Sequence, residues 1–385
     1  MGKIAELYEE RSAIRSDLFA GRRPRRVPVY ASFSLEAACG FAGISLMEAH
    51  YDLGLAEKAH ERVCELFYSD SFPSGNLRYP PVYQLLGAKN WILASNGAVQ
   101  HPEIETMLVE DYDEFIARPY DTIVEKFLPR VCTALDTDPI SRGIAFAKAF
   151  QTYCEQKAAH FGIIGRLSKK YGYTPGIIAG PQTEAPFDFV ADQLRGFKAV
   201  LMDCRRMPEK VDAAARAILP FMIKLAVPED GPGAGIQAFI PLHLAPYMRQ
   251  KQFEELWWPS FEELVAEIDR SGVGTTIFAE NDWTRFLPYL ERLPRSVVVW
   301  AEDGDQERYA ATVGREHAFG GFFDPTITLA RSKEECIDAA KRMCDACMGS
   351  GHFYFTFNRG VMDAASVDIG KLQAVLEWLR DNAVY

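Results

Sequence analysis

Short apolar runs alternate with amphipathic segments along most of this chain, and this alternation limits the folds that are open to it. Each run has the length of a buried strand, and most are followed by a segment with the apolar periodicity of a helix. Strands that alternate with helices form parallel sheets with right-handed crossovers. Eight such units predict a closed (β/α)8 barrel, the TIM barrel, rather than an open sheet. The apolar runs cover residues 27–33, 90–96, 175–181, 236–242, 274–280, 296–302, 317–323 and 352–358.

Two regions depart from this alternation of strands and helices. Residues 1–24 begin with a charged segment that predicts an exposed entry helix over residues 3–19. Residues 103–170 are helical in pattern and too long for a minimal crossover, so they predict a helical insertion. Because no linker rich in Gly or Ser divides the chain, we expect a single domain over residues 1–385. The first strand is not followed by GxGxxG, which disfavours a dinucleotide-binding fold.

The charge and the hydropathy of the chain disfavour several classes of partner. Its formal net charge is −11, so we expect no surface that neutralises nucleic-acid phosphates. No apolar run approaches the roughly 20 residues of a membrane-spanning helix, and the first residues lack the apolar centre of a signal peptide. We therefore expect a cytoplasmic protein without nucleic-acid or membrane partners. Its eight cysteines show no framework spacing, which predicts reduced and mostly buried thiols.

Polar side chains follow two of the predicted strands at the point where each strand ends. His243 follows the run 236–242, and Glu280 and Asp282 lie at the end of the run 274–280. The carboxyl ends of parallel strands share one face of a barrel, so we expect these side chains to converge there. An imidazole and carboxylates can transfer protons or bind a metal such as zinc. Asp282 could instead cap the helix expected from Trp283.

Acidic residues in two other segments are further candidates. Glu184 and Asp188 are four residues apart at the start of a predicted helix, so they share one side of it. Acidic residues also interact favourably with the positive end of a helix dipole, and this structural explanation stays open. Asp70 lies in a segment rich in Ser, Pro and Gly, residues 69–81, which we expect to be a loop near the barrel mouth. There it is either a turn residue or a catalytic one.

Several of these segments carry a resemblance to a known family. The chain resembles the uroporphyrinogen decarboxylase superfamily, which holds decarboxylases and zinc- and corrinoid-linked methyltransferases. This resemblance implies a single (β/α)8 barrel whose site lies at the carboxyl ends of the strands. It covers roughly residues 25–385. It rests on VPVYASFSLEAACGFAGISLMEA (27–49), ELFYSDSFP (65–73), the block 239–265, IFAEND (277–282) and the tail segments 321–345 and 357–379.

The chain departs from two branches of this superfamily. The stretch 29–41 has no arginine where true uroporphyrinogen decarboxylases carry the arginines that bind substrate carboxylates. Asp70 does match the aspartate that those decarboxylases direct at the pyrrole NH groups, which keeps that activity as an alternative. Members that methylate thiols have His-x-Cys where this chain has Phe278-Ala279-Glu280, and a later Cys where it has Arg359. A thiolate-rich zinc site is therefore not expected.

The resemblance then implies a methyltransferase that demethylates a small methoxy-aromatic methyl donor and passes the methyl group to a corrinoid protein. Zinc held by His243 and Glu280, or a proton donor, would assist the leaving group. Glu280, His243 and, in the alternative, Asp70 are the expected catalytic residues, and Glu184, Asp282 and Arg359 the expected substrate-binding residues. Arg359 either meets a substrate carboxylate or pairs with a carboxylate of the barrel. The alternatives are a tetrapyrrole decarboxylase and a non-catalytic corrinoid- or tetrapyrrole-binding barrel, and we expect a homodimer.

Overall fold

The structure is a computed structural model that describes residues 2–75, 78–229, 231 and 235–385. Six strands form one sheet in the order β1-β10-β9-β8-β7-β6, and each neighbouring pair is parallel. The strands are β1 (Val29–Tyr30), β6 (Gln237–Leu242), β7 (Gly274–Asp282), β8 (Val297–Asp303), β9 (Ala318–Gly321) and β10 (Phe353–Thr356).

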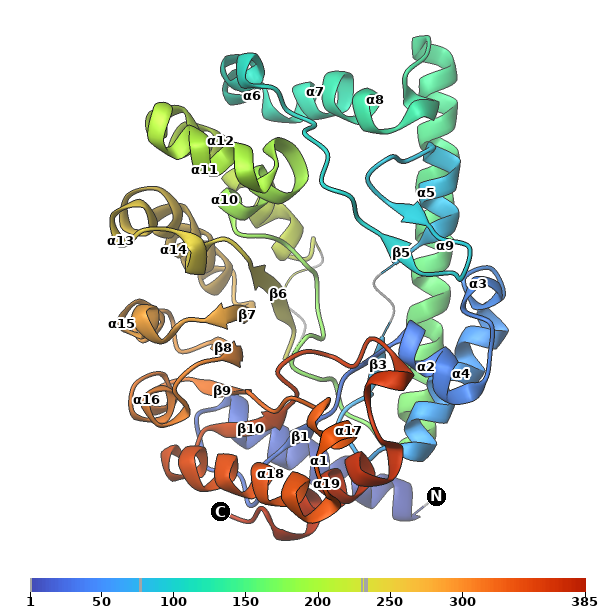
Figure 1. Ribbon diagram of the computed structural model, residues 1–385, viewed down its shortest axis with the longest axis vertical. Coiled ribbons are helices and arrows are strands. Elements are labelled where there is room, and N and C mark those ends of the chain that lie inside the picture. Colours follow the sequence, from blue (N-terminus) through green and yellow to red (C-terminus); the bar gives the residue numbers. More distant parts are fainter. Residues whose placement is uncertain (1, 76–77, 230, 232–234) are drawn as a thin grey trace.

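Two further segments close this sheet into a ring. Residues 69–75 run beside β1, where the Asp70 N–H donates to the Val29 carbonyl over 2.7 Å. Residues 174–183 form parallel bridges to residues 69–75 on one side and to β6 on the other. Eight parallel segments therefore surround one axis, with helices outside them (Figure 1). This arrangement confirms the prediction of a (β/α)8 barrel.

One predicted strand is wrong. Residues 90–96 lie outside the ring, where β4 (Ile92–Leu93) and β5 (Val99–Gln100) form a small antiparallel hairpin. The second barrel strand comes instead from residues 69–75, which the sequence pattern suggested to be a loop. That segment carries Ser and Asp at buried positions, so it lacks the apolar run by which a barrel strand is recognised. Its upper end, β3 (Ser74–Gly75), pairs in parallel with β2 (Phe33–Ser34).

Helices pack around the ring and extend from it on one side. In Figure 1 the helices that follow β6, β7 and β8 lie outside those strands, and the long helix α9 stands on the opposite side of the molecule. The α-helices are α1 (Gly2–Phe19), α2 (Leu35–Ala42), α3 (Leu46–Ala49), α4 (Leu53–Leu66), α5 (Pro80–Leu86), α6 (Tyr112–Ala117), α7 (Pro119–Thr122), α8 (Leu128–Val131), α9 (Pro139–Tyr171), α10 (Pro186–Phe189), α11 (Phe197–Arg206), α12 (Pro208–Ala226), α13 (Gln250–Gln252), α14 (Trp258–Arg270), α15 (Leu287–Leu290), α16 (Gln306–Ala311), α17 (Ile327–Ala330), α18 (Lys333–Cys347) and α19 (Ile369–Asn382).

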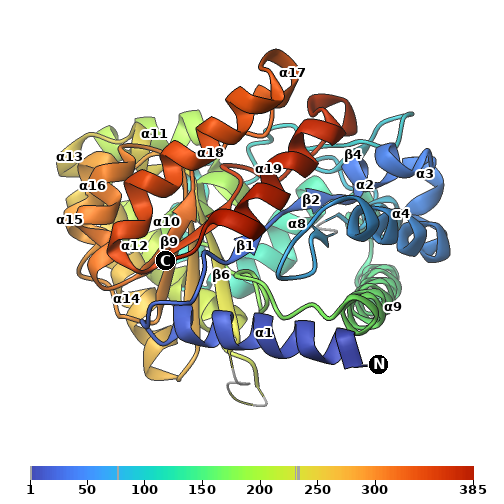
Figure 2. The same cartoon turned by 90° about the horizontal axis from the view of Figure 1, so that it is seen from below.

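The interior of the barrel is filled by alternate residues of its strands. Side chains from β1, β7, β8, β9 and β10 pack into one buried apolar cluster, and Leu18 of α1 joins them from below. Figure 2 shows α1 lying across the end of the barrel at which the strands begin. That end is therefore closed by α1, and any chemistry needs the opposite end. The cluster is Leu18, Tyr30, Ile177, Phe278, Val298, Trp300, Ala318 and Tyr354.

Among the helices of the described residues, none has both the length and the apolar character that crossing a bilayer requires.

Candidate functional site

Three neighbouring strands place polar side chains directly above the apolar interior. Successive side chains of a strand point to opposite faces, so a residue two positions after an inward one is again inward. Phe278 and Trp300 belong to the interior cluster, and Glu280 and Glu302 follow them by two positions on β7 and β8. His243 stands at the end of β6. A histidine and two carboxylates therefore lie together at the mouth of the barrel, where the strands end, as the sequence predicted for His243 and Glu280.

A helix adds three more carboxylates to the same mouth. Glu184, Asp188 and Asp192 are spaced four residues apart along the segment that leads into α10 and the π-helical turn after it, Val190–Arg195. The fully buried Asp188 accepts the His243 backbone N–H over 2.8 Å and the indole N–H of Trp257 over 2.6 Å. These two bonds fix the helix start against the end of β6. A π-helical turn is rare, and such turns occur frequently at functional sites.

The His243 imidazole lies between carboxylates from two elements. Its Nδ1 is 3.5 Å from Oε2 of Glu280 and 3.7 Å from Oδ2 of Asp192. All three side chains are partly exposed at this end of the barrel, so a ligand in the mouth can reach them. Glu184 lies deeper. Its Oε1 accepts a hydrogen bond from Gln193 over 3.0 Å, whereas its buried Oε2 has no hydrogen-bond partner among the residues that the structure describes.

Burial and mutual repulsion keep these carboxyl groups protonated at unusually high pH. Burial, together with the charge of Asp188, raises the pKa of Glu184 to about 7. Burial, and then the charge of Asp188, raises the pKa of Asp192 to about 8, although His243 opposes the shift. Burial also raises the pKa of Asp188 and of Glu280. Carboxyl groups at this spacing share protons, so the cluster holds at least one carboxylic acid near neutral pH.

Arg359 pairs with a carboxylate of the barrel. Its Nε lies 2.5 Å from Oε1 of Glu302, and the other oxygen of Glu302 accepts the Asn281 backbone N–H over 2.8 Å. The side-chain amide of Asn281 donates a hydrogen bond to the Tyr247 hydroxyl over 3.2 Å. The sequence left open whether Arg359 contacts a substrate carboxylate or a carboxylate of the barrel. In the structure it pairs with a barrel carboxylate, that of Glu302. Arg359 thereby fixes the Glu302 side chain at the rim of the mouth. Its positive charge also acts to lower the pKa of the neighbouring Glu280, against the larger effect of burial.

The end of β7 is irregular where it enters the mouth. Its pairing with β8 shifts register between Ala279 and Asp282, and Asn281 adopts a left-handed backbone with φ of 61°. Bulges of this kind redirect side chains next to active sites. Asp282 then lies outside the carboxylate cluster, and its Oδ1 accepts the Thr284 backbone N–H over 2.7 Å. This bond closes a turn ahead of the 3-10 helix Thr284–Phe286, whose N-cap position is taken by Trp283. The structure therefore gives Asp282 neither the N-cap position that the sequence offered as the alternative nor a place in the carboxylate cluster.

Asp70 lies at the closed end of the barrel. Its carboxylate forms two hydrogen bonds with Arg26, over 2.8 and 2.7 Å, and accepts the Tyr68 hydroxyl over 2.7 Å. It also accepts the Val29 backbone N–H over 2.8 Å, and Asp70 is only 1% exposed. These contacts occupy the carboxylate with structural partners beside α1. The structure therefore does not bring the predicted catalytic Asp70 to the mouth, and a substrate there cannot reach it.

The zinc site predicted at His243 and Glu280 has two donors in place. Their separation of 3.5 Å is close to the roughly 3.4 Å between two donors that share a tetrahedral zinc at about 2.1 Å. Zinc sites in proteins use at least three protein ligands. No group of three or more His, Cys, Asp and Glu side chains in the described part of the chain is arranged to hold a metal ion. The donors present in the described residues therefore do not make up a zinc centre.

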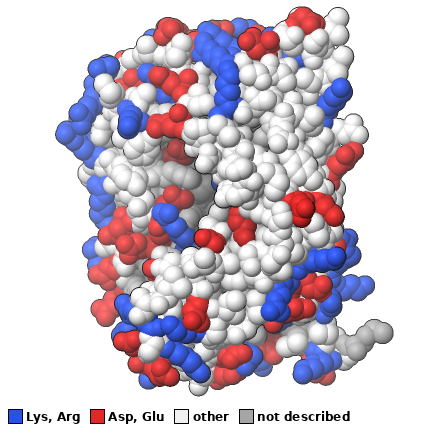
Figure 3. Space-filling model, turned by 45° about the vertical axis from the view of Figure 1, so that its right-hand side comes forward, with Lys and Arg blue, Asp and Glu red and all other residues white. Residues whose placement is uncertain are grey.

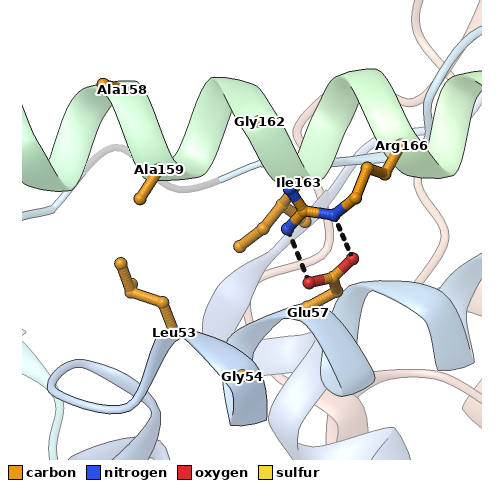
Figure 4. Close-up of a pocket in the computed structure, with 8 residues that line it drawn as sticks. All are labelled: Leu53, Gly54, Glu57, Ala158, Ala159, Gly162, Ile163 and Arg166. Carbon is orange, nitrogen blue, oxygen red and sulfur yellow. Dashed lines mark hydrogen bonds and ion pairs between the residues drawn. The ribbon is translucent and has the colours of Figure 1, made fainter.

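A surface hollow of about 290 Å³ between α4 and α9 is separate from this cluster. Figure 4 shows it crossed by a two-bond ion pair in which Arg166 donates to Glu57 over 2.8 and 2.7 Å. The remaining residues that line it are Leu53, Gly54, Ala158, Ala159, Gly162 and Ile163. Since the two charged groups satisfy each other and the others are apolar or Gly, the hollow carries no catalytic constellation.

Comparisons with known proteins agree with this architecture. The family model described as "Uroporphyrinogen decarboxylase (URO-D)" matches residues 152–381, which include α10 and every strand from β6 to β10. Among solved structures, a methyltransferase from Methanosarcina mazei is similar, with a TM-score of 0.60 and 13% sequence identity. The similarity covers 95% of this chain and 96% of that one, and at this identity it shows a shared fold. No curated protein matches the sequence significantly.

Proposed function

The chain belongs to the uroporphyrinogen decarboxylase family, and from its site we propose that it is a methyltransferase that demethylates a small methoxy-aromatic substrate and passes the methyl group to a corrinoid protein. One observation carries the proposal: a histidine and a row of acidic side chains from separate elements converge above an aromatic floor. The fold shared with a methyltransferase from Methanosarcina mazei supports the same reaction class.

The aromatic floor suits the substrate. Phe278 and Trp300 are in ring contact, with centroids 4.2 Å apart, and Phe239 lies beside Trp300. Both Phe278 and Trp300 keep a small exposed fraction just below Glu280 and Glu302. An aromatic ring gains from stacking on such a surface and from leaving water. A methoxy group on that ring would then lie at the level of the acidic side chains.

The acidic side chains supply the proton that the leaving group needs. In the proposed reaction the methyl carbon–oxygen bond breaks, its electron pair stays on oxygen, and the carboxylic acid proton of Asp192 moves to that oxygen. The methyl group would go to a reduced corrinoid on the partner protein, which would provide the electron pair of the new bond to the methyl carbon. Without the proton the leaving group would be a phenoxide, and general acid catalysis of such a step contributes about 10²- to 10⁴-fold.

The neighbours of Asp192 keep it ready for this role. Asp188 holds the helix against the end of β6 and, by its charge, favours the protonated form of Asp192. His243 lies within 3.7 Å of Asp192 and within 3.5 Å of Glu280, so its imidazole can return a proton from solvent after each turnover. Glu184, protonated up to about pH 7, is a second proton reservoir beside them.

A decarboxylase acting on a tetrapyrrole fits the site less well. The mouth gathers carboxylates on two strand ends and one helix, and its arginine, Arg359, is already paired with Glu302. A substrate with several carboxylates would meet repulsion there. Asp70, on which that reading depends, is held by Arg26 at the closed end. Tight binding of a corrinoid without turnover of any methyl donor would instead indicate a binding protein.

The direct test uses free cob(I)alamin as the methyl acceptor and a panel of methoxybenzenes as donors. We expect consumption of cob(I)alamin with release of the corresponding phenol, and lower rates in His243→Ala and Glu280→Gln. The rate should be level below about pH 7 and fall towards tenfold per unit above about pH 8, because the acid form of Asp192 is the active one. Unchanged rates in both variants, or carbon dioxide release without a methyl acceptor, would sink the proposal.

Metal content is the second check. Elemental analysis of the purified protein is expected to give well below one zinc per chain, because in the described residues no third His, Cys, Asp or Glu side chain is arranged to complete a metal site with His243 and Glu280. One zinc per chain that is lost in both His243→Ala and Glu280→Gln would contradict this. That result would mean that a metal ion, rather than the proton of Asp192, activates the leaving group.

A further inference from the structure

Tyr247 stands at the same mouth as the carboxylate cluster and takes no part in the proposed proton transfer. It lies four residues after His243, in the 3-10 turn Ala245–Tyr247 that follows β6, and 58% of it is exposed. Its ring packs edge-on against that of Phe197 on α11, with centroids 5.2 Å apart. Its hydroxyl accepts a hydrogen bond from the side-chain amide of Asn281, at the end of β7, over 3.2 Å. Tyr247 therefore joins three of the elements that surround the mouth.

The turn that carries Tyr247 is fixed by its neighbours. The Nη2 atom of Arg285 donates to the carbonyls of Ala245, Pro246 and Met248, over 3.3, 2.9 and 2.7 Å. Ala245 and Met248, before and after Tyr247, are buried. The backbone is thus held while the ring of Tyr247 stays largely exposed. Such a ring suits contact with a ligand, because little conformational entropy remains to be lost on binding.

The partner of the Tyr247 hydroxyl has an unusual backbone. Asn281 is one of two residues other than Gly with a positive φ in the described part of the chain. Residues held in this way cluster at functional sites. The backbone N–H of Asn281 donates to Glu302 over 2.8 Å, and its side-chain amide donates to Tyr247. The irregular end of β7 therefore orients a carboxylate and a hydroxyl at the mouth together.

The direction of this hydrogen bond leaves the proton of the Tyr247 hydroxyl available. A tyrosine hydroxyl donates one hydrogen bond and also accepts. Here the oxygen accepts from Asn281, and no acceptor for the proton is found among the residues that the structure describes. Figure 3 shows the mouth side of the molecule hollowed, with acidic side chains along the hollow. These acidic groups disfavour an anionic ligand oxygen, so the group that fits is a neutral acceptor such as an ether.

We propose that Tyr247 is a substrate-binding residue, and that the substrate is a methoxybenzene with a second ether oxygen that accepts the Tyr247 hydroxyl proton. This inference rests on the proposed function, since it takes the floor of Phe278 and Trp300 as the place of the ring. Asn281 is a positioning residue, because its amide sets the direction of the hydroxyl proton. A ring held from below by the floor and at one edge by Tyr247 presents its other methoxy group to the acidic side chains.

Calorimetric titration without a methyl acceptor tests the proposal, because it measures binding in the absence of reaction. Each of the three dimethoxybenzenes is compared with the ethylmethoxybenzene of the same substitution pattern, which has the same shape but a CH2 in place of one oxygen. For at least one pattern we expect wild-type protein to bind the dimethoxybenzene about two- to tenfold more tightly, the range of one neutral hydrogen bond. Tyr247→Phe should remove this preference.

Asn281→Asp tests the direction of the hydrogen bond. Its carboxylate accepts the Tyr247 O–H, so the preference should be lost although the hydroxyl is still present, and Asp tolerates a left-handed backbone. The double variant with Tyr247→Phe should lose no more than either single variant. Tyr51→Phe is the matched control, since Tyr51 is also exposed (47%) and its hydroxyl also bonds an amide side chain, that of Gln84 over 2.6 Å. The preference should persist in this control.

The outcomes separate this inference from the proposed function. Equal affinity for both members of every pair in wild-type protein, or a preference that survives Tyr247→Phe, would overturn the inference alone. A preference that behaves as expected, in a protein that consumes no cob(I)alamin with any dimethoxybenzene, would contradict the methyl transfer and leave Tyr247 as a binding residue. Binding of neither compound would overturn both. Circular dichroism confirms that each variant is folded.

Discussion

Replacement of Asp192 by Asn is expected to lower the rate constant of methyl transfer about 10²- to 10³-fold and to remove the fall in rate above about pH 8. The amide keeps the shape of the side chain but has no acidic proton to give to the leaving oxygen. Binding of the methoxy-aromatic substrate should change little, because the ring rests on Phe278 and Trp300. Stopped-flow measurement of cob(I)alamin consumption at several pH values gives both results.

Two controls accompany this variant. Asp282→Asn makes the same chemical change in a residue whose side chain closes the turn after β7, and Asn closes such a turn equally well, so its rate should stay within about twofold of wild type. The melting temperature of Asp192→Asn should be no lower than that of wild type, since the change removes a partly buried carboxyl group that neighbouring carboxylates repel. If Asp282→Asn loses as much activity as Asp192→Asn, the acid has been assigned to the wrong residue.

Replacement of Asp70 by Asn is expected to destabilise the protein by about 3–5 kcal/mol without a matching loss of chemistry in the molecules that remain folded. The substitution leaves the Arg26 guanidinium buried and without its two-bond partner, and Arg11 loses the same neighbouring charge at 3.6 Å. Urea unfolding followed by tryptophan fluorescence measures the stability, and the rate per folded molecule measures the chemistry.

Glu10→Gln serves as the reference for Asp70→Asn. Glu10 also contacts Arg26, at 3.3 Å, but it is partly exposed, so its loss should cost less than about 1 kcal/mol. If Asp70→Asn keeps wild-type stability and abolishes activity, then Asp70 acts in the reaction. That result would favour the alternative function, a decarboxylase, because it would mean that substrate reaches the closed end of the barrel.

The sequence was sufficient for the barrel as a fold because seven of its eight strands are continuous apolar runs. The failure at the second strand has a physical cause. Residues 69–75 are held in the ring by backbone hydrogen bonds and by the Asp70–Arg26 pair, with little apolar surface of their own. The run 90–96 has the apolar composition of a strand, but Ile92 is 44% exposed in a hairpin outside the barrel. Hydrophobicity alone therefore assigns the second barrel strand to the wrong one of these two segments.

The candidate site was predictable where it depends on strand ends and less so where it depends on a helix. His243 and Glu280 follow from the rule that polar residues at the carboxyl ends of parallel strands converge. The same rule could have found Glu302, which closes the run 296–302. Asp192 continues the four-residue spacing of Glu184 and Asp188, but only the fold shows that this side of the helix faces the mouth. The shift of Asp282 away from the mouth required knowledge of the irregular end of β7.

The pairing of β1 with β10 also determines when during synthesis this protein can become complete. Tyr30 lies beside Thr356, whose hydroxyl donates to the Tyr30 carbonyl over 2.6 Å, and 326 residues separate them in the chain. A nascent chain therefore carries the edge of β1 without its β10 neighbour until Thr356 has been made. Such long-range closure folds slowly and leaves strand edges available for wrong contacts. The barrel is thus assembled from its first strand but becomes a ring only with its last.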